Sequence, residues 1–330
     1  MPANLTPDYL AAEKRFREAE TTEDKLAALE EMYATIPKHK GTEKLQADIR
    51  RRTSKLRDKE KQLTRKGKRH DDFHVIKQGA GQVVLVGPPN SGKSSIVDRL
   101  TAAEPEIADY PFTTRRPLPA MADFEDVSIQ LVDSPAMAGE HTERGVIGLA
   151  RNADAVALVL DASNDAIIDH VEDVMGEFSK SRTAIVGELA ESRDFPPGIV
   201  VKPGFVIANK IDKQGASANL EVLRELYANE FVIHTTSAET GEGLEELRRR
   251  FFESLGIIRV YTKIPGKPPD RDKPFTVKRG STLIDFAAAV HKDFAAGLRF
   301  AKAWGARVLP GAQIGRDHVL EDGDVVELHA

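Results

Sequence analysis

Residues 82–94 read QVVLVGPPNSGKS, an apolar run that leads directly into a glycine-rich turn. The turn fits the pattern G-x-x-x-x-G-K-[ST] from Gly87 to Ser94, and helical spacing continues through Ser94–Thr101. A glycine-rich turn between a strand and a helix is the context that defines a P-loop, in which successive backbone N–H groups surround phosphate oxygens. The stretch therefore predicts a phosphate-binding turn at the edge of an α/β sheet.

The side chains of this turn have separate expected tasks. Lys93 would bring a positive charge to the β- and γ-phosphates of a nucleotide, and the Ser94 hydroxyl would be a ligand of Mg²⁺. An ordinary glycine-rich turn without a ligand is disfavoured by the strand before the motif and the helix after it. The residues expected to contact the phosphates are Gly87, Pro88, Pro89, Asn90, Ser91, Gly92, Lys93, Ser94 and Ser95.

A second motif indicates which base is bound. Residues 209–212 read NKID and directly follow the apolar run Phe205–Ala208. The carboxylate of this motif can accept hydrogen bonds from the ring N–H and the amine of guanine, whereas adenine has neither donor there. The asparagine is expected at the other edge of the base, and the lysine stem across its ring. The expected base contacts are Asn209, Lys210, Asp212 and, through a backbone N–H to the guanine carbonyl, Ser237 and Ala238.

Two segments between these motifs are expected to hold Mg²⁺. Asp133 ends the apolar run Ile129–Val132, where GTPases carry D-x-x-G, and it would hold the ion through a water molecule. Residues 110–114 read YPFTT and occupy the place of a switch loop, in which Thr114, or Thr113 beside it, would bind the ion. The expected metal ligands are Ser94, Thr114 and Asp133.

The chain departs from the usual GTPase pattern at two adjacent residues, the last residue of D-x-x-G and the residue that follows it. Ala136 replaces the glycine; it keeps the N–H that can reach the γ-phosphate but resists unusual backbone angles. Met137 stands where many GTPases place a glutamine, and a methionine cannot align water. Unstimulated hydrolysis should therefore be slow.

The expected catalytic residues are Lys93, Thr114 and Asn90. Several GTPases with an asparagine at the P-loop position of Asn90 recruit K⁺ beside the phosphates, and the same is expected here. Two alternatives to a GTPase stay open from the sequence. One is a GTP-dependent binding module with negligible hydrolysis, and the other is a metabolic P-loop enzyme that acts on a small molecule.

The apolar pattern predicts three parts: a helical N-terminal arm at 1–80, a Ras-like GTPase domain at 81–256 and a small α+β domain at 257–330. In the middle part, short apolar strands alternate with helices, which implies a mostly parallel sheet with helices on both faces. The expected strands are Val83–Val86, Ile129–Val132, Val156–Leu160, Phe205–Ala208 and Phe231–Thr235. The arm is expected to form a helical hairpin with a narrow apolar stripe that packs on the body or on a partner.

Charge is distributed unevenly along the chain, whose net charge is −5. Residues 38–69 carry fourteen Lys or Arg against four Asp or Glu, a local balance of +10, whereas residues 70–330 sum to −11. A basic arm on an acidic body is typical of a nucleic-acid contact. A solvated, salt-bridged helix, or a surface for a protein partner only, would explain the same charges.

With these motifs in place, the chain resembles the Obg-related GTPases, specifically the developmentally regulated GTP-binding protein branch. The resemblance includes the basic helix at Lys38–Leu56, the YPFTT switch, and a C-terminal region with IRVYTK at Ile258–Lys263 that is similar to a TGS domain. It implies a β-grasp fold for the last domain, association with ribosome or RNA through Lys38–Arg69 and the TGS domain, and a protein cofactor. The family usually carries a helical insertion between D-x-x-G and N-K-x-D, and the span from Asp133 to Asn209 leaves room for a reduced version at most.

The last domain could add basic contacts to RNA through Lys292, Arg299, Lys302 and Arg307. Trp304 is expected to belong to the core of this small domain rather than to a base-stacking platform.

Composition narrows the class of protein further. The chain has 330 residues, of which 30% are charged, and it has no cysteine. No apolar run approaches the roughly 18 residues that a membrane span needs, and the N-terminus lacks the profile of a secretory signal. We therefore expect a cytoplasmic protein without disulfides or a membrane contact.

Overall fold

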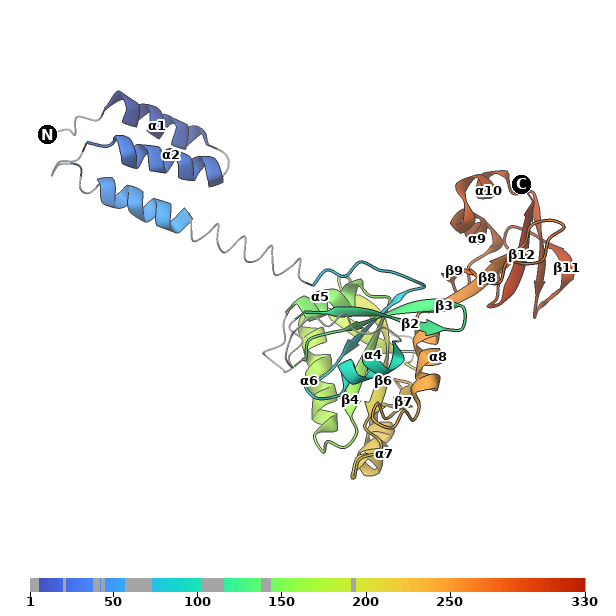
Figure 1. Ribbon diagram of the computed structural model, residues 1–330. Helices are drawn as coiled ribbons and strands as arrows, with labels where there is room; N and C mark the ends of the chain where they lie inside the picture. The colour runs from blue at the N-terminus through green and yellow to red at the C-terminus, as the bar shows by residue number, and fades with distance from the viewer. Residues whose placement is uncertain are drawn as a thin grey trace. The chain divides into compact units, whose positions relative to one another are not determined.

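The computed structural model describes residues 6–19, 22–37, 42, 45–56, 73–101, 116–137, 144–190 and 194–329. The chain divides into two compact units, Met1–Asp72 and Phe73–Ala330 (Figure 1). No helix in the described ranges is long and apolar enough to cross a membrane.

The first unit contains three helices in its described part: α1 (Pro7–Glu18), α2 (Thr22–Thr35) and a helix over residues 45–56. Thr6 caps α1 by accepting a hydrogen bond from the backbone N–H of Tyr9, and its own hydroxyl donates to the carbonyl of Thr35 at the end of α2. The buried residues of the three helices form one cluster: Tyr9, Ala12, Leu29, Met32, Ile36 and Ile49. The helical N-terminal arm is confirmed, and α1 adds a third helix whose buried residues join those of α2 and of residues 45–56.

The second unit is built on a seven-stranded sheet in the order β2-β3-β1-β4-β6-β5, with β7 paired to β6. Its strands are β1 (Gln82–Val86), β2 (Leu118–Phe124), β3 (Val127–Asp133), β4 (Ala155–Asp161), β5 (Thr183–Gly187), β6 (Val200–Asn209) and β7 (Ile233–Thr235). All pairs are parallel except β2–β3, which form a hairpin. The prediction of a mostly parallel sheet is confirmed.

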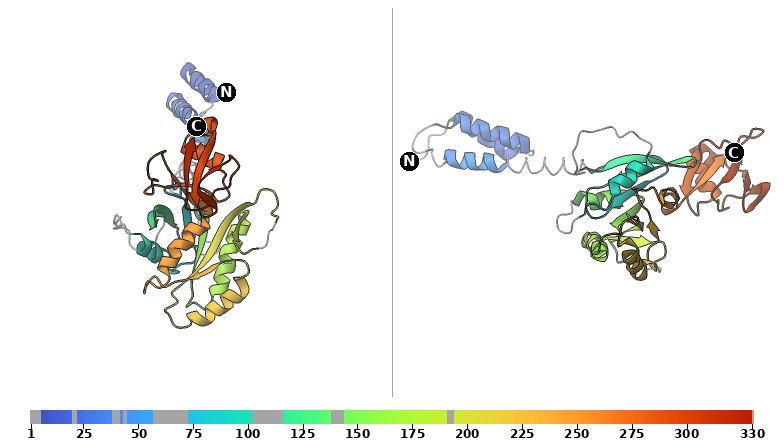
Figure 2. Two further views of the ribbon diagram at one scale, coloured as in Figure 1. Left: turned by 90° about the vertical axis from the view of Figure 1, so that its right-hand side faces the viewer. Right: turned by 60° about the horizontal axis from the view of Figure 1, so that its bottom comes forward.

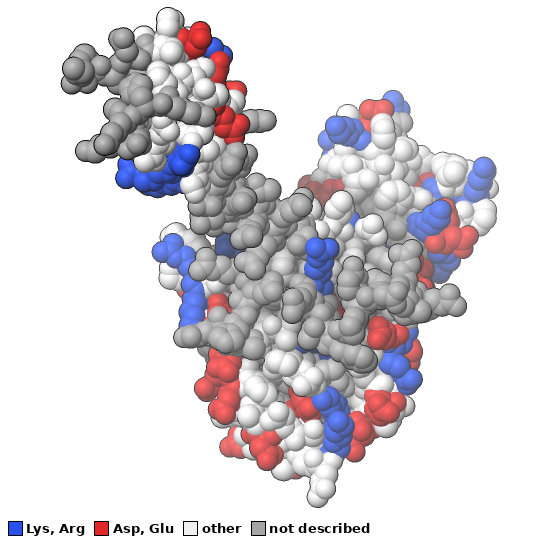
Figure 3. Space-filling view, turned by 60° about the vertical axis from the view of Figure 1, so that its left-hand side comes forward, with Lys and Arg blue, Asp and Glu red and all other residues white. Residues whose placement is uncertain are grey.

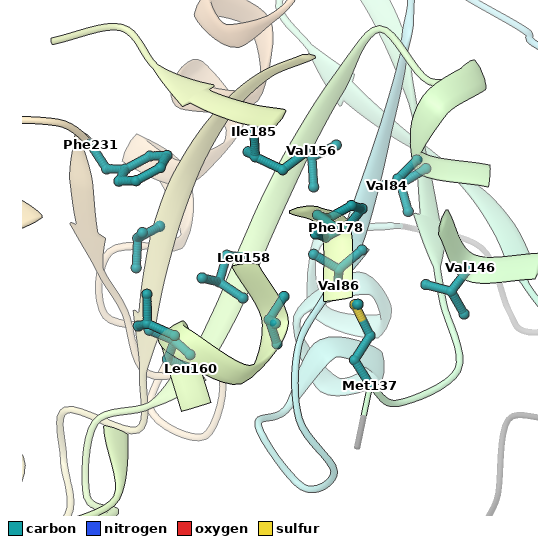
Figure 4. Close-up of a cluster of buried hydrophobic side chains, with 14 of the residues drawn as sticks. Val84, Val86, Met137, Val146, Val156, Leu158, Leu160, Phe178, Ile185 and Phe231 are labelled. Carbon is teal, nitrogen blue, oxygen red and sulfur yellow. The ribbon is translucent and has the colours of Figure 1, made fainter. Parts of the chain in front are cut away.

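Helices cover both faces of this sheet (Figures 1 and 2). They are α4 (Lys93–Leu100), α5 (Arg144–Asn152), α6 (Ile167–Lys180), α7 (Ala216–Tyr227) and α8 (Leu244–Ser254). Alternate residues of β1 face opposite ways: Val84 and Val86 pack with α5, α6 and α7, whereas Val83 and Leu85 pack with α4 and α8. Figure 4 shows part of the first of these two core clusters. Burial on both sides explains why the central strands are continuous apolar runs.

The last domain is a five-stranded sheet in the order β11-β10-β12-β8-β9. Its elements are β8 (Ile257–Thr262), β9 (Phe275–Lys278), α9 (Leu283–Val290), α10 (Lys292–Gly297), β10 (Phe300–Gly305), β11 (Val308–Ile314) and β12 (Asp324–His329). Helices α9 and α10 are separated at His291, which has an extended backbone. A capping box between Thr282 and Asp285 starts α9.

Trp304 does not belong to the core of this domain, so that prediction was wrong. Ala301 and Ala303 of β10 are fully buried under the helices, and strand alternation therefore places Phe300, Lys302 and Trp304 on the opposite face. Trp304 is half-buried there, with the Lys263 ammonium 4.7 Å from its ring centroid.

Candidate nucleotide-binding site

The P-loop connects the carboxyl end of β1 to the first turn of α4. Two glycines are required by its geometry. Gly87 has φ +149°, and a Cβ there would lie 2.2 Å from the Val159 carbonyl oxygen. Gly92 has φ +93°, and a Cβ there would lie 2.2 Å from Nδ2 of Asn209. The turn therefore fits closely between β4 and the N-K-I-D loop, and only residues without a side chain can occupy these two positions.

Lys93 lies inside the turn rather than on the surface. It is 7% exposed, and its Nζ donates hydrogen bonds of 3.0 Å to the carbonyls of Gly87 and Pro88. Burial lowers the pKa of Lys93 to about 8, while the nearby Asp133 carboxylate acts in the opposite direction. The ammonium is thus held within the loop that would surround the phosphates.

Asp133 has the environment of a ligand for a hard cation. Its carboxylate is 3% exposed; Oδ2 accepts a 2.5 Å hydrogen bond from the Ser94 hydroxyl, and Oδ1 is buried without a hydrogen-bond partner. Burial raises the pKa of Asp133, partly offset by the bond from Ser94 and by the charge of Lys93. A buried carboxylate oxygen beside a serine hydroxyl fits Mg²⁺, which prefers oxygen ligands.

The N-K-I-D loop is locked to the P-loop by side-chain hydrogen bonds. Nδ2 of Asn209 donates to the Ser91 carbonyl (3.0 Å), and its Oδ1 accepts from the backbone N–H of Ala238 (3.0 Å). Asn209 is 1% exposed, so its amide joins three loops rather than lying open beside a base. The Ala238 N–H that the sequence predicts for the guanine carbonyl is bonded to Asn209 in this structure.

Lys210 adds a second connection between the same loops. It has φ +63°, and its Nζ donates to the Asn90 carbonyl (2.5 Å) and to Oδ2 of Asp161 (2.6 Å). Burial alone would raise the pKa of Asp161, but hydrogen bonds from Lys210 and Ser163 lower it below its ordinary value. The stem of Lys210 is thereby held along the P-loop.

Asp212 is exposed, and its Oδ1 accepts a 2.5 Å hydrogen bond from the Ser237 hydroxyl. The carboxylate predicted to select guanine is therefore oriented by the loop after β7, and its second oxygen remains available for a base.

One residue of this site was missed from the sequence. Asp161 ends β4 and pairs in register with Asn209, which ends β6. A polar residue directly after a buried parallel strand, at the edge where the other motifs lie, is the signal that could have found it.

The residues after Asp133 are tied to the frame of the site. The Ser134 hydroxyl donates to the Leu85 carbonyl (2.7 Å), and the Met137 N–H donates to the Gly87 carbonyl (2.9 Å). Met137 is 2% exposed and belongs to the core cluster shown in Figure 4. Its side chain thus packs with apolar residues in place of the water-orienting role that a glutamine has in other GTPases.

The switch loop at residues 110–114, with Thr113 and Thr114, lies outside the described residues. Of the expected metal ligands, the structure brings Ser94 and Asp133 together. Of the other predicted phosphate contacts, Ser91 has a buried hydroxyl without a hydrogen-bond partner, whereas Asn90 is exposed with φ +60°.

Comparisons with known proteins agree with this geometry. The family model described as "50S ribosome-binding GTPase" matches residues 82–188, and the "TGS domain" model matches residues 258–330. Developmentally-regulated G-protein 2 of Arabidopsis thaliana is 28% identical, with 92% of this chain and 90% of that protein covered. An uncharacterized GTP-binding protein of Methanocaldococcus jannaschii is 26% identical, with 93% of this chain and 92% of that protein covered.

The chain is a homologue of the developmentally regulated GTP-binding proteins. Its central domain is a P-loop GTPase domain and its last domain is a TGS domain. The YchF GTPase of Schizosaccharomyces pombe has the same kind of fold, with a TM-score of 0.53 and 14% identity over 77% of this chain and 99% of that one. The alignment to the Arabidopsis relative spans 369 positions, more than the 330 residues of this chain, so the relative carries residues without a counterpart here.

Proposed function

We propose that this protein binds GTP with Mg²⁺, hydrolyses it to GDP and phosphate, and acts as a nucleotide switch associated with the ribosome or with RNA. The observation that carries the proposal is the Asn209 amide, which bonds to Ser91 of the P-loop and to Ala238 beside the base loop. This link joins the predicted phosphate loop to the predicted guanine loop, which supports a ligand that carries both groups.

In the mechanism we propose, one residue supplies positive charge to the phosphates and other residues hold the metal ions. Lys93 would turn its ammonium from the Gly87 and Pro88 carbonyls to the β- and γ-phosphates and stabilise the charge that develops as water attacks in line. Ser94 and Asp133 would hold Mg²⁺, which when bound neutralises phosphate charge. Thr114 would join them from the switch loop, and Asn90 would help to recruit K⁺.

A second candidate is a GTP-dependent binding module with negligible hydrolysis. The buried side chain of Met137 favours it, because a methionine packed in the core cannot orient water. Stimulation by K⁺ or by a partner separates the two candidates.

The first test is GTP turnover in KCl and in NaCl at equal ionic strength, with and without purified ribosomes. Turnover that rises with K⁺ and again with ribosomes supports the switch. Tight GTP binding with negligible turnover in every condition supports the binding module. Lys93→Ala should abolish turnover, and Asp212→Asn should reduce the preference for GTP over ATP, since the amide would offer a donor to guanine donors.

RNA association is proposed for the basic helix over residues 45–56 and for the outer face of the TGS sheet. Arg51 and Arg52 are 80% and 56% exposed and share the carboxylate of Asp48. Figure 3 shows one group of basic side chains gathered on the lower side of the N-terminal unit, whereas basic and acidic side chains are interspersed on the second unit. The outer TGS face carries Phe300, Lys302 and Trp304, the combination of rings and charge that binds single-stranded RNA.

The test of this partner is binding to ribosomes or RNA at increasing salt. A phosphate contact predicts affinity that falls steeply with salt, and Arg51→Gln/Arg52→Gln should reduce that slope. The matched control is Arg15→Gln/Arg17→Gln, which removes two exposed, ion-paired arginines from α1 of the same unit. Equal effects of the two variants, or binding insensitive to salt, would point to a protein partner instead.

A further inference from the structure

The β2–β3 hairpin has one end at the nucleotide site and the other at the TGS domain. At its open end, Leu118 of β2 pairs with Asp133 of β3, the carboxylate that contacts Ser94. At its closed end, Glu125 and Asp126 form the turn, with φ +51° at Glu125. Seven residues of strand span about 20 Å between these ends.

Two residues of the TGS domain bind the turn of this hairpin. Nη1 of Arg259 donates to Asp126 (2.9 Å) and also contacts Glu125, while the Tyr261 hydroxyl donates to Asp126. Nη2 of the same guanidinium donates to Asp322 of the TGS domain (2.7 Å). Arg259 has a side chain only 12% exposed, and its guanidinium holds carboxylates from both domains through charged hydrogen bonds.

The titration behaviour of these groups agrees with this geometry. The hydrogen bonds that Arg259 donates to Asp322, Glu125 and Asp126 raise its pKa. Burial and the bond to Asp126 raise the pKa of Tyr261 to about 12. The pKa of Asp126 is lowered, since its bonds to Tyr261 and Arg259 outweigh its burial. The contacts therefore persist as charged and hydrogen-bonded pairs at neutral pH.

Helix α8 packs beside the same contact. The Phe252 ring stacks on Phe124 of β2 at 5.3 Å between centroids, and the Arg259 guanidinium lies 5.1 Å from the Phe252 ring. Arg248 of α8 donates to the Asp123 carbonyl (2.9 Å). Only Leu255 and Gly256 separate α8 from β8. The TGS domain is therefore joined to the hairpin both through the chain and through side chains.

We propose that the turn of the β2–β3 hairpin, held by Arg259 and Tyr261, couples the nucleotide state of the GTPase domain to the TGS domain. The inference rests on the proposed function, because it needs GTP and GDP to bind. A difference between the two nucleotides at the open end of the hairpin changes the position of β2, an edge strand paired only with β3 among the described strands. The turn then transmits that change to Arg259 of β8, and β8 transmits it to the other strands of the TGS sheet.

The TGS domain contains its own optical reporter. Trp304 is the single tryptophan of the chain. It pairs with Val325 of β12, which pairs with Tyr261 of β8, so Trp304 and Tyr261 occupy one row, about 10 Å apart across two strand spacings. A change at the Tyr261–Asp126 contact therefore reaches the indole through a single intervening strand.

The decisive experiment rests on the reciprocity of coupling between two sites. If the Arg259 contact responds to the nucleotide state, a substitution that breaks this contact must change the affinities for GTP and GDP by different factors. The full chain is titrated with a non-hydrolysable GTP analogue and with GDP, and the ratio of the two dissociation constants is compared between wild type and Arg259→Gln. The control is Arg250→Gln, because Arg250 is also 12% exposed, is ion-paired with Glu188 and Glu253, and stacks on Phe205, all within the GTPase domain. Trp304 fluorescence is recorded in each nucleotide state.

We expect Arg259→Gln to change the affinity ratio by about fivefold or more and to remove the nucleotide-dependent change in Trp304 emission, whereas Arg250→Gln leaves both unchanged. Tyr261→Phe, which removes only a hydroxyl, should act in the same direction and serves if Arg259→Gln unfolds. Normal binding of both nucleotides with an unchanged ratio in both TGS variants would overturn the coupling while leaving the proposed function intact. Failure of wild type to bind either nucleotide would overturn both.

Discussion

The lowered pKa of Lys93 predicts that nucleotide affinity depends on pH in a defined window. The pKa is about 8 when the ammonium is buried against the Gly87 and Pro88 carbonyls. Phosphate oxygens favour the charged form, so the pKa should be higher in the complex. Binding then requires proton uptake above pH 8, and affinity should fall as the pH rises; below pH 8 the free lysine is already protonated and affinity should be flat.

The magnitude follows from the same pKa. At pH 9 only about a tenth of the free protein carries the proton, so the dissociation constant for GDP should be about tenfold larger than at pH 7, equivalent to about 1.4 kcal/mol. The assay is a titration with a fluorescent GDP analogue between pH 7 and 9. Calorimetry in two buffers of different ionisation enthalpy should show the proton uptake directly.

The control for this prediction is Lys93→Gln, which should bind more weakly at pH 7 and show no further loss up to pH 9. A flat affinity in wild type would refute the lowered pKa. The same slope in wild type and in Lys93→Gln would show that another group, rather than Lys93, takes up the proton.

Three further substitutions test other parts of the structure. Gly92→Ala should weaken GTP and GDP binding at least tenfold and lower the free energy of unfolding by about 1–3 kcal/mol, because φ is +93° and the new Cβ meets Asn209; unchanged nucleotide titrations would contradict the loop packing. Ile49→Ala, at a 2% exposed core position, should destabilise the N-terminal unit by about 2–4 kcal/mol in calorimetry without changing nucleotide affinity; weakened binding would show that the two units do not fold separately. Met137→Gln should lower the free energy of unfolding by about 1–3 kcal/mol and should not accelerate hydrolysis, because the position is buried; faster single-turnover hydrolysis would show that this side chain leaves the core.

The central strands and the motif loops could be predicted because the strands are buried on both faces and lead directly into loops whose residue types indicate nucleotide binding. Strands β1 and β4 are buried along almost their whole length, so their sequences are mainly apolar runs, which stop at the glycine of the P-loop and at Asp161. Edge strands do not give this signal. β2 alternates weakly and contains Pro119, and β5 is fully buried only at alternate positions, so the sequence did not distinguish either from a loop.

Interactions between segments could not be predicted from residue types alone. Trp304 was assigned to the core because of its size, but its position in β10 relative to the buried Ala301 and Ala303 decides its face. The amide of Asn209 was expected at a base edge, and only the approach of the P-loop shows that Ser91 and Ala238 occupy its hydrogen bonds. Arg259 likewise has no motif of its own, because its partners come from distant parts of the chain.

The two segments that leave the nucleotide site toward the rest of the chain differ in how firmly they are held. Residues 134–137 are bonded to Leu85 and Gly87, and moving them would extract Met137 from the core, at about the 2–5 kcal/mol that truncating a buried methionine costs. β2 is half-exposed at the edge of the sheet and leads to the turn at Asp126. A nucleotide can move only the element whose contacts it changes by more than the cost of moving it. Strand β2 is therefore the better route for a signal from the nucleotide. Replacement of the D-x-x-G glycine by Ala136 need not prevent a nucleotide switch in this protein.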